Sequence, residues 1–228
     1  MILAIESATP RGSVALVSGG AVLAEVFLPP GPRASGSDLS AVEALFAAAG
    51  AGAGGVSAVA VSAGPGAFTG LRVGMSAAKG FCFGWGVPLV PVPTLLALAH
   101  RFPGEGRIVC PVQDARRGEV YAALFRWVGG ELARLSPDMA IAPGLLPGRI
   151  PDGDILFCGD GVAPFGAMFR DALGDRAILV SGDEGLPRAA AVGIVGERIL
   201  RDGGAEDPRT ALPFYLRSSG TEFPLPRP

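Results

Sequence analysis

Hydrophobic and polar residues follow two alternating periods along the chain, a pattern that is typical of an α/β protein. Gly19 and Gly20 predict a tight hairpin turn, because two-residue turns of this kind need positive φ angles. Short apolar runs on either side and before them predict three strands, at residues 2–5, 14–17 and 21–27. The chain is therefore expected to open with a strand meander and a loop at residues 7–12.

The first helical pattern lies between residues 38 and 49, where apolar residues recur at every third or fourth position. Residues 40–43 fit a capping box, and Ser37 or Asp38 offers a cap one turn earlier. Gly50 is expected to end this helix in the left-handed conformation.

The rest of the first hundred residues alternates strands with helices. The expected elements are a strand at 59–61, a glycine-rich turn at 64–70, a helix at 71–83, a strand at 89–92 and a short helix from a Thr94 cap to His100. This β-β-β-α-β-α order resembles the repeated lobe of the actin-like, Hsp70-like and hexokinase-like ATPases. The likeness concerns architecture and does not by itself indicate an activity.

A polar stretch at residues 101–106 suits a boundary between two lobes. We expect an N-terminal lobe at residues 1–100 and a C-terminal lobe at residues 101–228, with the final helix and the tail in the second lobe. The elements predicted beyond the boundary are strands at 108–112, 120–127, 132–135, 155–158 and 178–180, and helices at 164–173 and 187–200. The proline-rich residues 223–228 are expected to be ordered only where they dock.

Composition indicates a soluble cytoplasmic protein. The mean hydropathy is +0.43, yet no uninterrupted apolar run reaches the roughly 20 residues that span a membrane. Glu6 follows the first apolar run directly, and no basic region precedes that run, so no signal peptide is expected. The net charge is −2 and Lys79 is the single lysine, which disfavours binding of tRNA by this chain alone.

Cysteine and histidine usage argues against a metal site. Cys82, Cys110 and Cys158 form no C-x-x-C pair, so we expect three small buried side chains and neither a zinc site nor a disulfide framework. His100 is the only histidine and is expected to act as a helix-capping or interface residue. A peptidase of the Ser-His or Cys-His type has to use His100, and no G-x-S-x-G string surrounds any serine, so this class is a remote alternative.

The most informative string is residues 64–74, which read GPGAFTGLRVG between an expected strand and an expected helix. Glycines at such a junction let the backbone approach an anion at the helix N-terminus. The spacing fits neither a Walker loop nor the dinucleotide fingerprint, because Lys79 lies too far on and Thr69 stands where the third glycine belongs. A tight structural turn remains the alternative interpretation.

As a string, these residues resemble the G-P-G-S-F-T-G-L-R-x-G motif of the TsaB (YeaZ) family, whose members act in making threonylcarbamoyladenosine on tRNA. Residues 1–9, 77–80, 87–90, 114–121, 159–161 and 213–217 continue the resemblance in order along the chain. Three departures stand out. Glu6 replaces an aspartate, Ala67 replaces the motif serine, and the histidine after the third strand is missing from residues 33–37.

The resemblance implies an α/β protein with a two-lobed actin-like ATPase fold, each lobe a mixed sheet with flanking helices. It also implies a scaffold or activator of threonylcarbamoyl transfer to the adenosine beside the anticodon, without catalysis of its own. The implied partners are a TsaD-like catalytic subunit with paired metal-binding histidines, a TsaE-like ATPase, a second copy when alone, and tRNA through the complex; no membrane is implied. The expected interface residues lie on the two N-terminal helices: Leu39, Val42, Phe46, Leu71, Met75, Ala78, Lys79 and Cys82.

A second hypothesis is a nucleotide-binding ATPase of the actin-like class, with ATP or ADP held loosely between the lobes and no other cofactor expected. Asp114 and Arg116 face the same way by alternation, which indicates either an exposed ion pair or an arginine poised for phosphate. The candidate phosphate contacts are Ser7, Gly12, Gly64, Gly66, Thr69, Gly70, Asp114, Arg116, Gly159 and Asp160. The loss of a hydroxyl at Ala67 weakens this hypothesis.

Overall fold

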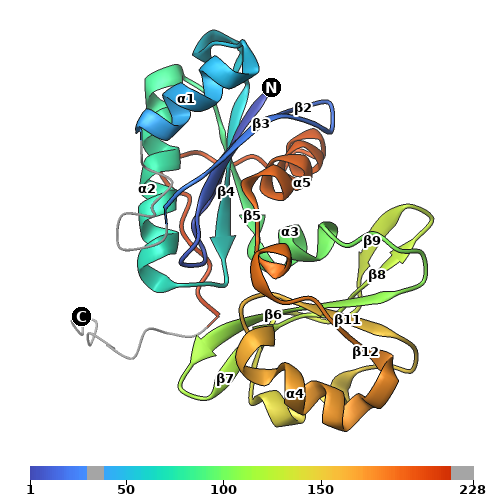
Figure 1. The fold of residues 1–228 in the computed structure, drawn as a ribbon. Helices are drawn as coiled ribbons and strands as arrows, with labels where there is room; N and C mark the ends of the chain where they lie inside the picture. Colours follow the sequence, from blue (N-terminus) through green and yellow to red (C-terminus); the bar gives the residue numbers. More distant parts are fainter. Residues whose placement is uncertain (30–38, 217–228) are drawn as a thin grey trace, which may run out of the picture.

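The structure of the chain is a computed structural model that describes residues 1–29 and 39–216. These residues form two lobes, each built on one sheet (Figure 1). The first sheet has the strand order β3-β2-β1-β4-β5. Its strands β1 to β3 are antiparallel neighbours, whereas β4 and β5 run parallel to β1. These strands are β1 (Ile2–Glu6), β2 (Ser13–Ser18), β3 (Ala21–Phe27), β4 (Ala58–Gly64) and β5 (Leu89–Pro93).

The second sheet has the order β10-β7-β6-β11-β12, with β8 pairing β6 and β9 beside β8. Its strands are β6 (Ile108–Arg116), β7 (Glu119–Ala122), β8 (Phe125–Val128), β9 (Glu131–Arg134), β10 (Met139–Ile141), β11 (Ile155–Cys158) and β12 (Ala177–Leu179). The two antiparallel pairs and the two parallel pairs fall at the same places as in the first sheet. The duplicated, two-lobed actin-like fold expected from the sequence is therefore confirmed.

Helices cover both faces of the first sheet (Figure 1). On one face, α1 and α2 enclose a core of branched side chains such as Leu3, Ile5 and Val61. On the other, α5 lies on a surface rich in alanine, and α3 sits between the two sheets. The helices are α1 (Leu39–Ala49), α2 (Phe68–Trp85), α3 (Thr94–His100), α4 (Val162–Leu173) and α5 (Ala189–Arg201), and short 3-10 turns occur at Ala53–Gly55, Pro143–Leu145, Pro147–Arg149, Gly174–Arg176 and Gly182–Gly185.

The final helix belongs to a different lobe from the one expected. Helix α5 follows the second sheet in sequence but packs on β1, β2, β4 and β5 of the first. Two glycines allow the close approach, since a Cβ at Gly193 would lie 2.5 Å from Val17 and one at Gly196 would lie 2.7 Å from Ala60. Placing the final helix in residues 101–228 as part of the second lobe was thus wrong, because its apolar face matches the alanine-rich surface of the first sheet.

Several local expectations hold and several do not. Gly19, Gly20 and Gly50 all have positive φ angles, as expected for the hairpin turn and the helix end. The expected strand at 120–127 is two strands, because the chain leaves β7 at Ala122 and starts β8 at Phe125 beside a different part of β6. Strand β10 was not expected.

Two expected helix caps are absent. Ser40 lies inside α1, which begins at Leu39, so the capping box at residues 40–43 was wrong. Thr94 is the first residue of α3, and its hydroxyl accepts a hydrogen bond from the Gly64 N–H instead of capping the helix. The alternative caps at Ser37 and Asp38, and the proline-rich tail at 223–228, lie outside the described residues. Within the described ranges, none of the helices is both long enough and apolar enough to cross a bilayer.

Candidate functional site

The glycine-rich turn before α2 is closed by the loop that follows β1. The Ser7 hydroxyl donates a hydrogen bond of 2.9 Å to the Gly70 carbonyl, and the Ala67 N–H donates one of 2.8 Å to the Ala8 carbonyl. A Cβ at Gly70 would overlap the Ser7 carbonyl oxygen, and one at Gly66 would lie 2.7 Å from the Ala8 Cβ. These glycines are therefore needed so that two loops of the same chain can touch.

The start of the turn is closed by a segment from the end of the chain. The Phe214 N–H donates a 2.6 Å hydrogen bond to the Ala63 carbonyl, and the Phe214 carbonyl occupies the space that a side chain at Gly64 would need. The positive φ of Gly64 adds a second reason for glycine at this position. Segment 211–216 thus lies across the carboxyl end of β4.

Gly159 and Gly161 of the second lobe also allow two parts of the chain to pack closely. A Cβ at Gly159 would overlap the Val112 carbonyl, and one at Gly161 would lie 2.8 Å from the Val112 side chain. The Gly161 N–H donates to that same carbonyl at 3.0 Å. The spaces beside these glycines are filled by strand β6.

Asp114 and Arg116 form the exposed ion pair that was one of the two expected arrangements. One guanidinium nitrogen of Arg116 lies 3.1 Å from Asp114 Oδ2, and the Arg116 N–H donates to Asp114 Oδ1 at 2.7 Å. The Arg116 side chain is 77% exposed, so this pair contributes under about 1 kcal/mol to stability. The Asp114 N–H in turn donates to Asp160 Oδ1 at 3.2 Å, which joins the two candidate acids of this lobe.

Glu6 is a buried carboxyl group at the end of β1. It accepts hydrogen bonds from the Ser62 hydroxyl and, at 2.7 Å, from the Ala8 N–H. Burial raises the pKa of Glu6 to about 7; these hydrogen bonds oppose the shift, and the charge of Asp160 adds to it. Burial likewise raises the pKa of Asp160. The sequence motif marked Glu6 as a departure but gave no sign of its full burial.

Gln113 is a buried residue that the sequence did not single out. It lies on the same side of β6 as Val109, which packs toward α3, and neither its Oε1 nor its Nε2 has a hydrogen-bond partner among the described residues. Two other candidate residues lie outside the contacts described above. The Gly12 carbonyl accepts a hydrogen bond from the Leu28 N–H at 3.0 Å, and Thr69 is exposed on the first turn of α2. Hydrogen bonds therefore join Ser7 to Gly70 in the first lobe and Asp114 to Asp160 in the second, whereas Gly12 and Thr69 lie apart from these pairs.

The spaces beside the candidate phosphate-binding glycines are occupied by other parts of this chain. The glycine spaces are filled by Ala8, Val112 and Phe214, and the Ser7 hydroxyl is already used. Among the described residues there is no group of three or more metal-ligating side chains. His100 packs against Trp127 with ring centroids 5.4 Å apart, and burial lowers its pKa, so it is a neutral residue at the contact between the lobes and not a charged helix cap.

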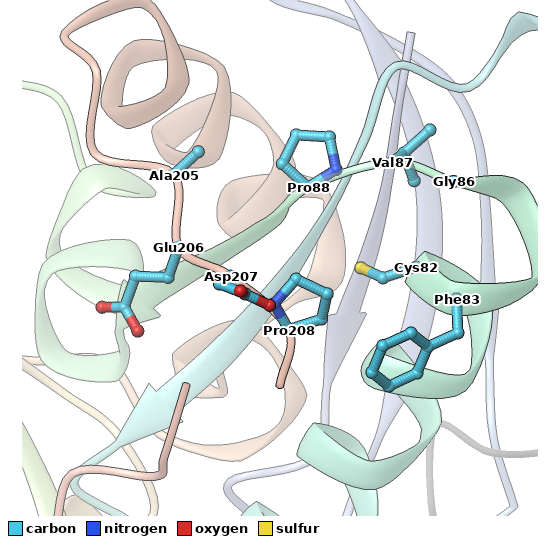
Figure 2. A pocket seen from close by; sticks show the side chains of 9 residues that line it. All are labelled: Cys82, Phe83, Gly86, Val87, Pro88, Ala205, Glu206, Asp207 and Pro208. Carbon is cyan, nitrogen blue, oxygen red and sulfur yellow. The ribbon is translucent and has the colours of Figure 1, made fainter. Parts of the chain in front are cut away.

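The three cysteines are free and buried, as expected. Burial raises the pKa of Cys82 to about 11, so its thiol stays protonated. Cys82 lies at one edge of a shallow groove of about 470 Å³ beyond the end of α2, where Figure 2 shows Phe83 beside it and the Glu206 side chain pointing away. This groove offers apolar contact rather than reactive chemistry.

Most of the expected interface residues are unavailable to a partner. Val42, Leu71, Met75, Ala78 and Cys82 are each at most 3% exposed, and all of them except Leu71 belong to the core cluster between α1, α2 and the first sheet. Phe46 and Lys79 are half-buried, and only Leu39 is freely exposed. Assigning these five buried residues to the interface was wrong: α2 has two apolar sides, and this side faces its own sheet.

The outer face of α1 and α2 consists of small and apolar residues with one acid, Glu43. Phe83 is 59% exposed, and nothing lies within 4 Å of a Cβ placed at Gly80 or Gly84. We define the outer face by its exposed or half-buried residues: Leu39, Ala44, Ala47, Ala48, Val73, Ala77, Gly80, Phe83 and Gly84. An apolar surface of this kind on two adjacent helices is typical of a protein–protein interface.

Comparison with known proteins identifies the family of this chain. The family model described as TsaD, tRNA N6-adenosine threonylcarbamoyltransferase, matches residues 38–224. The tRNA threonylcarbamoyladenosine biosynthesis protein TsaB of Escherichia coli is 29% identical over 236 residues, with 99% of this chain and 98% of that protein covered. TsaB of Bacillus subtilis is 28% identical over 158 residues, which covers 68% of this chain and 67% of that protein.

Among solved structures, an uncharacterised protein from Pseudomonas aeruginosa with similarity to peptidase YeaZ superposes with a TM-score of 0.79 and 26% identity. The superposition covers 95% of this chain and 99% of that one. Because the family model spans more than half of the sequence, and the relatives carry the names TsaB and YeaZ, the chain belongs to the TsaD-type threonylcarbamoyltransferase family and to its TsaB (YeaZ) members.

Proposed function

We propose that this chain is a partner subunit in tRNA modification that acts in the cytoplasm and does not catalyse the transfer itself. It would hold a TsaD-like catalytic subunit in a productive state while a threonylcarbamoyl group moves to the tRNA adenosine beside the anticodon, and a TsaE-like ATPase would complete the assembly. The names of the TsaB relatives support a role in making this modified nucleoside. The single histidine in the sequence means that paired histidines for a metal have to come from another chain.

The observation that carries the proposal is the outer face of α1 and α2. Gly80 and Gly84 lie inside a helix, where glycine costs about 1 kcal/mol relative to alanine, and no atom of the described chain uses the space beside them. A helix of another protein can use that space, because glycine and alanine allow helix axes to come close. The same face provides a contact between two copies when the catalytic subunit is absent.

The decisive experiment mixes this chain with its TsaD-like subunit and measures mass by size-exclusion chromatography with light scattering. We expect a one-to-one complex that Gly80→Glu abolishes, because the new charge projects from the outer face without entering the core. Ala167→Glu, on the exposed side of α4, is the matched control and leaves the complex intact. A complex that survives Gly80→Glu and Phe83→Glu contradicts this interface, and no complex at all contradicts the partner role.

Nucleotide binding between the lobes is a second candidate. The buried carboxamide of Gln113, which has no hydrogen-bond partner among the described residues, supports it, because a buried polar group without a protein partner is available to a ligand or to water. The filled glycine spaces oppose it. Calorimetry with ATP and Mg²⁺ tests whether a nucleotide binds. Heat of binding that Gln113→Leu removes favours this candidate, and no heat with a folded protein eliminates it.

A further inference from the structure

A groove runs between α2 and the segment that follows α5, on the flank of α2 beside the outer face. Its volume is about 450 Å³, within the range of roughly 300–1,000 Å³ typical of small-molecule sites. Met75 and the chain at residues 211–213 form its apolar wall. Its polar side chains are Arg72, Ser76, Lys79 and Tyr215.

Arg72 is held in a defined position by two aromatic rings. Its guanidinium carbon lies 3.9 Å from the centre of the Phe68 ring, and its Nε donates a 3.0 Å hydrogen bond to the Tyr215 hydroxyl. Neither of its terminal nitrogens makes a hydrogen bond or ion pair with the described residues. With respect to the described residues, the two terminal groups are therefore available to bind an anionic partner such as phosphate through two parallel hydrogen bonds.

Lys79 adds a second cation to the groove. It forms no ion pair with the described residues, and the acid whose pKa it helps to lower, Asp207, is held by Arg209 through hydrogen bonds of 2.6 and 2.9 Å. Arg72 and Lys79 therefore bring two positive charges that form no ion pair with an acid in the described part of the chain, although the whole chain has a net charge of −2.

The wall of the groove favours recognition through side chains. The N–H groups of Thr210 and Ala211 already donate to the Asp207 carbonyl, Phe214 donates to Ala63, and Pro213 has no N–H. A peptide strand therefore finds few backbone partners here. By contrast, the rings of Phe68 and Tyr215 are 38% and 36% exposed, and cations beside exposed aromatic rings are the usual combination for single-stranded nucleic acid.

We propose that the groove between α2 and residues 211–215 binds one nucleotide unit of single-stranded RNA. Arg72 and Lys79 contact the phosphates, and the base lies against Tyr215. The contact is too small to give tight binding alone, which agrees with the acidic composition of the chain. The inference goes beyond the proposed function and does not rest on it, because the isolated chain is sufficient for the test.

The test is fluorescence anisotropy of a labelled short oligouridylate titrated with the full chain at low salt. We expect weak binding whose logarithm falls with the logarithm of salt at a slope of about −1.4, the value for two phosphate contacts on a single strand. Lys79→Ala and Arg72→Ala each weaken binding about fivefold and bring the slope to about −0.7. Tyr215→Ala weakens binding about tenfold, whereas Tyr215→Phe keeps the ring, loses only the hydrogen bond from Arg72 Nε, and therefore weakens binding less than Tyr215→Ala does.

Arg201→Ala is the matched control, since Arg201 is an exposed arginine on α5, against the opposite face of the first sheet. It is expected to leave both affinity and slope unchanged. Absence of binding, or equal losses in Arg201→Ala and Lys79→Ala, overturns the proposal. Equal competition by a polyglutamate peptide also overturns it, because the groove is then selective for charge and not for RNA. These outcomes leave the partner-subunit proposal untouched, since that proposal is tested by complex formation.

Discussion

The two halves of α2 use glycine in opposite ways. In the N-terminal half, Gly70 and Gly74 lie against Ser7, and a methyl group at either position would overlap its atoms. In the C-terminal half, Gly80 and Gly84 have open space around them. All four lower the helix propensity of the same element, but only the first two offset that cost through contacts within the chain. The fold therefore requires Gly70 and Gly74, whereas the space beside Gly80 and Gly84 is available to a partner protein.

The strongest way to break this comparison is Gly70→Ala. The added methyl group meets the Ser7 backbone carbonyl, which cannot rotate away, so we expect a loss of about 3 kcal/mol or more in the free energy of unfolding. Denaturant unfolding followed by circular dichroism measures it. A loss below about 1 kcal/mol would show that the loop after β1 moves easily and that this end of α2 is open to ligands after all.

Glu6 provides a second test of the comparison. Its pKa depends on how completely water is excluded from the loop that packs on the N-terminal half of α2. Its pKa is raised from 4.5 to about 7, so the folded chain keeps a proton that the unfolded chain has lost over that range. Stability from this group is therefore present at low pH and falls as pH rises from about 4.5 to 7. Relative to Glu6→Gln, the original chain should lose about 2–3 kcal/mol of unfolding free energy between roughly pH 5 and pH 8.

Parallel unfolding curves of the two proteins across that pH range are the measurement. The matched control is Glu43→Gln, on an exposed position of α1, whose difference from the original chain should stay constant. A constant difference for Glu6→Gln as well would mean that water reaches the carboxyl group.

The smallest expected effect is a gain in the stability of the isolated chain. Gly80→Ala, in open space, should stabilise the isolated chain by about 0.5–1 kcal/mol, because alanine is the better helix former. The same variant should weaken binding of the TsaD-like subunit if a partner helix uses that space. Unfolding and binding measured on one sample compare the two effects, and a gain in both would show that no partner helix needs the open space beside Gly80.

The sequence was sufficient for most of the order of elements, apart from β10 and the break between β7 and β8, but not for the direction in which helices face. The opening meander, the helix after the glycine-rich turn and the two-lobed fold were predictable, because they depend on local periodicity and turn residues. The inner side of α2 was not, since Met75 and Val73 are equally apolar and only the position of the sheet decides which is buried. Glycine at residues 64–70 indicated a close approach, yet a ligand and a neighbouring loop leave the same signal in sequence.

Long-range pairing explains the remaining differences. Nothing near Ala189 in the sequence indicates that its helix returns to the first sheet, because the alanine-rich surface it covers lies far earlier in the chain. Gln113 shows the opposite difficulty. A polar residue within a strand is expected at the surface, yet Gln113 is 2% exposed, and its burial depends on tertiary packing that the local sequence does not reveal.

The return of α5 has a consequence for synthesis on the ribosome. Domains generally fold in the order in which they emerge, but one side of the first sheet stays uncovered until residue 201 has been made. The nascent first lobe therefore exposes an apolar alanine and valine surface throughout translation of the second. A truncated chain that ends after β12 should bind holdase chaperones, and a separately supplied α5 peptide should release it.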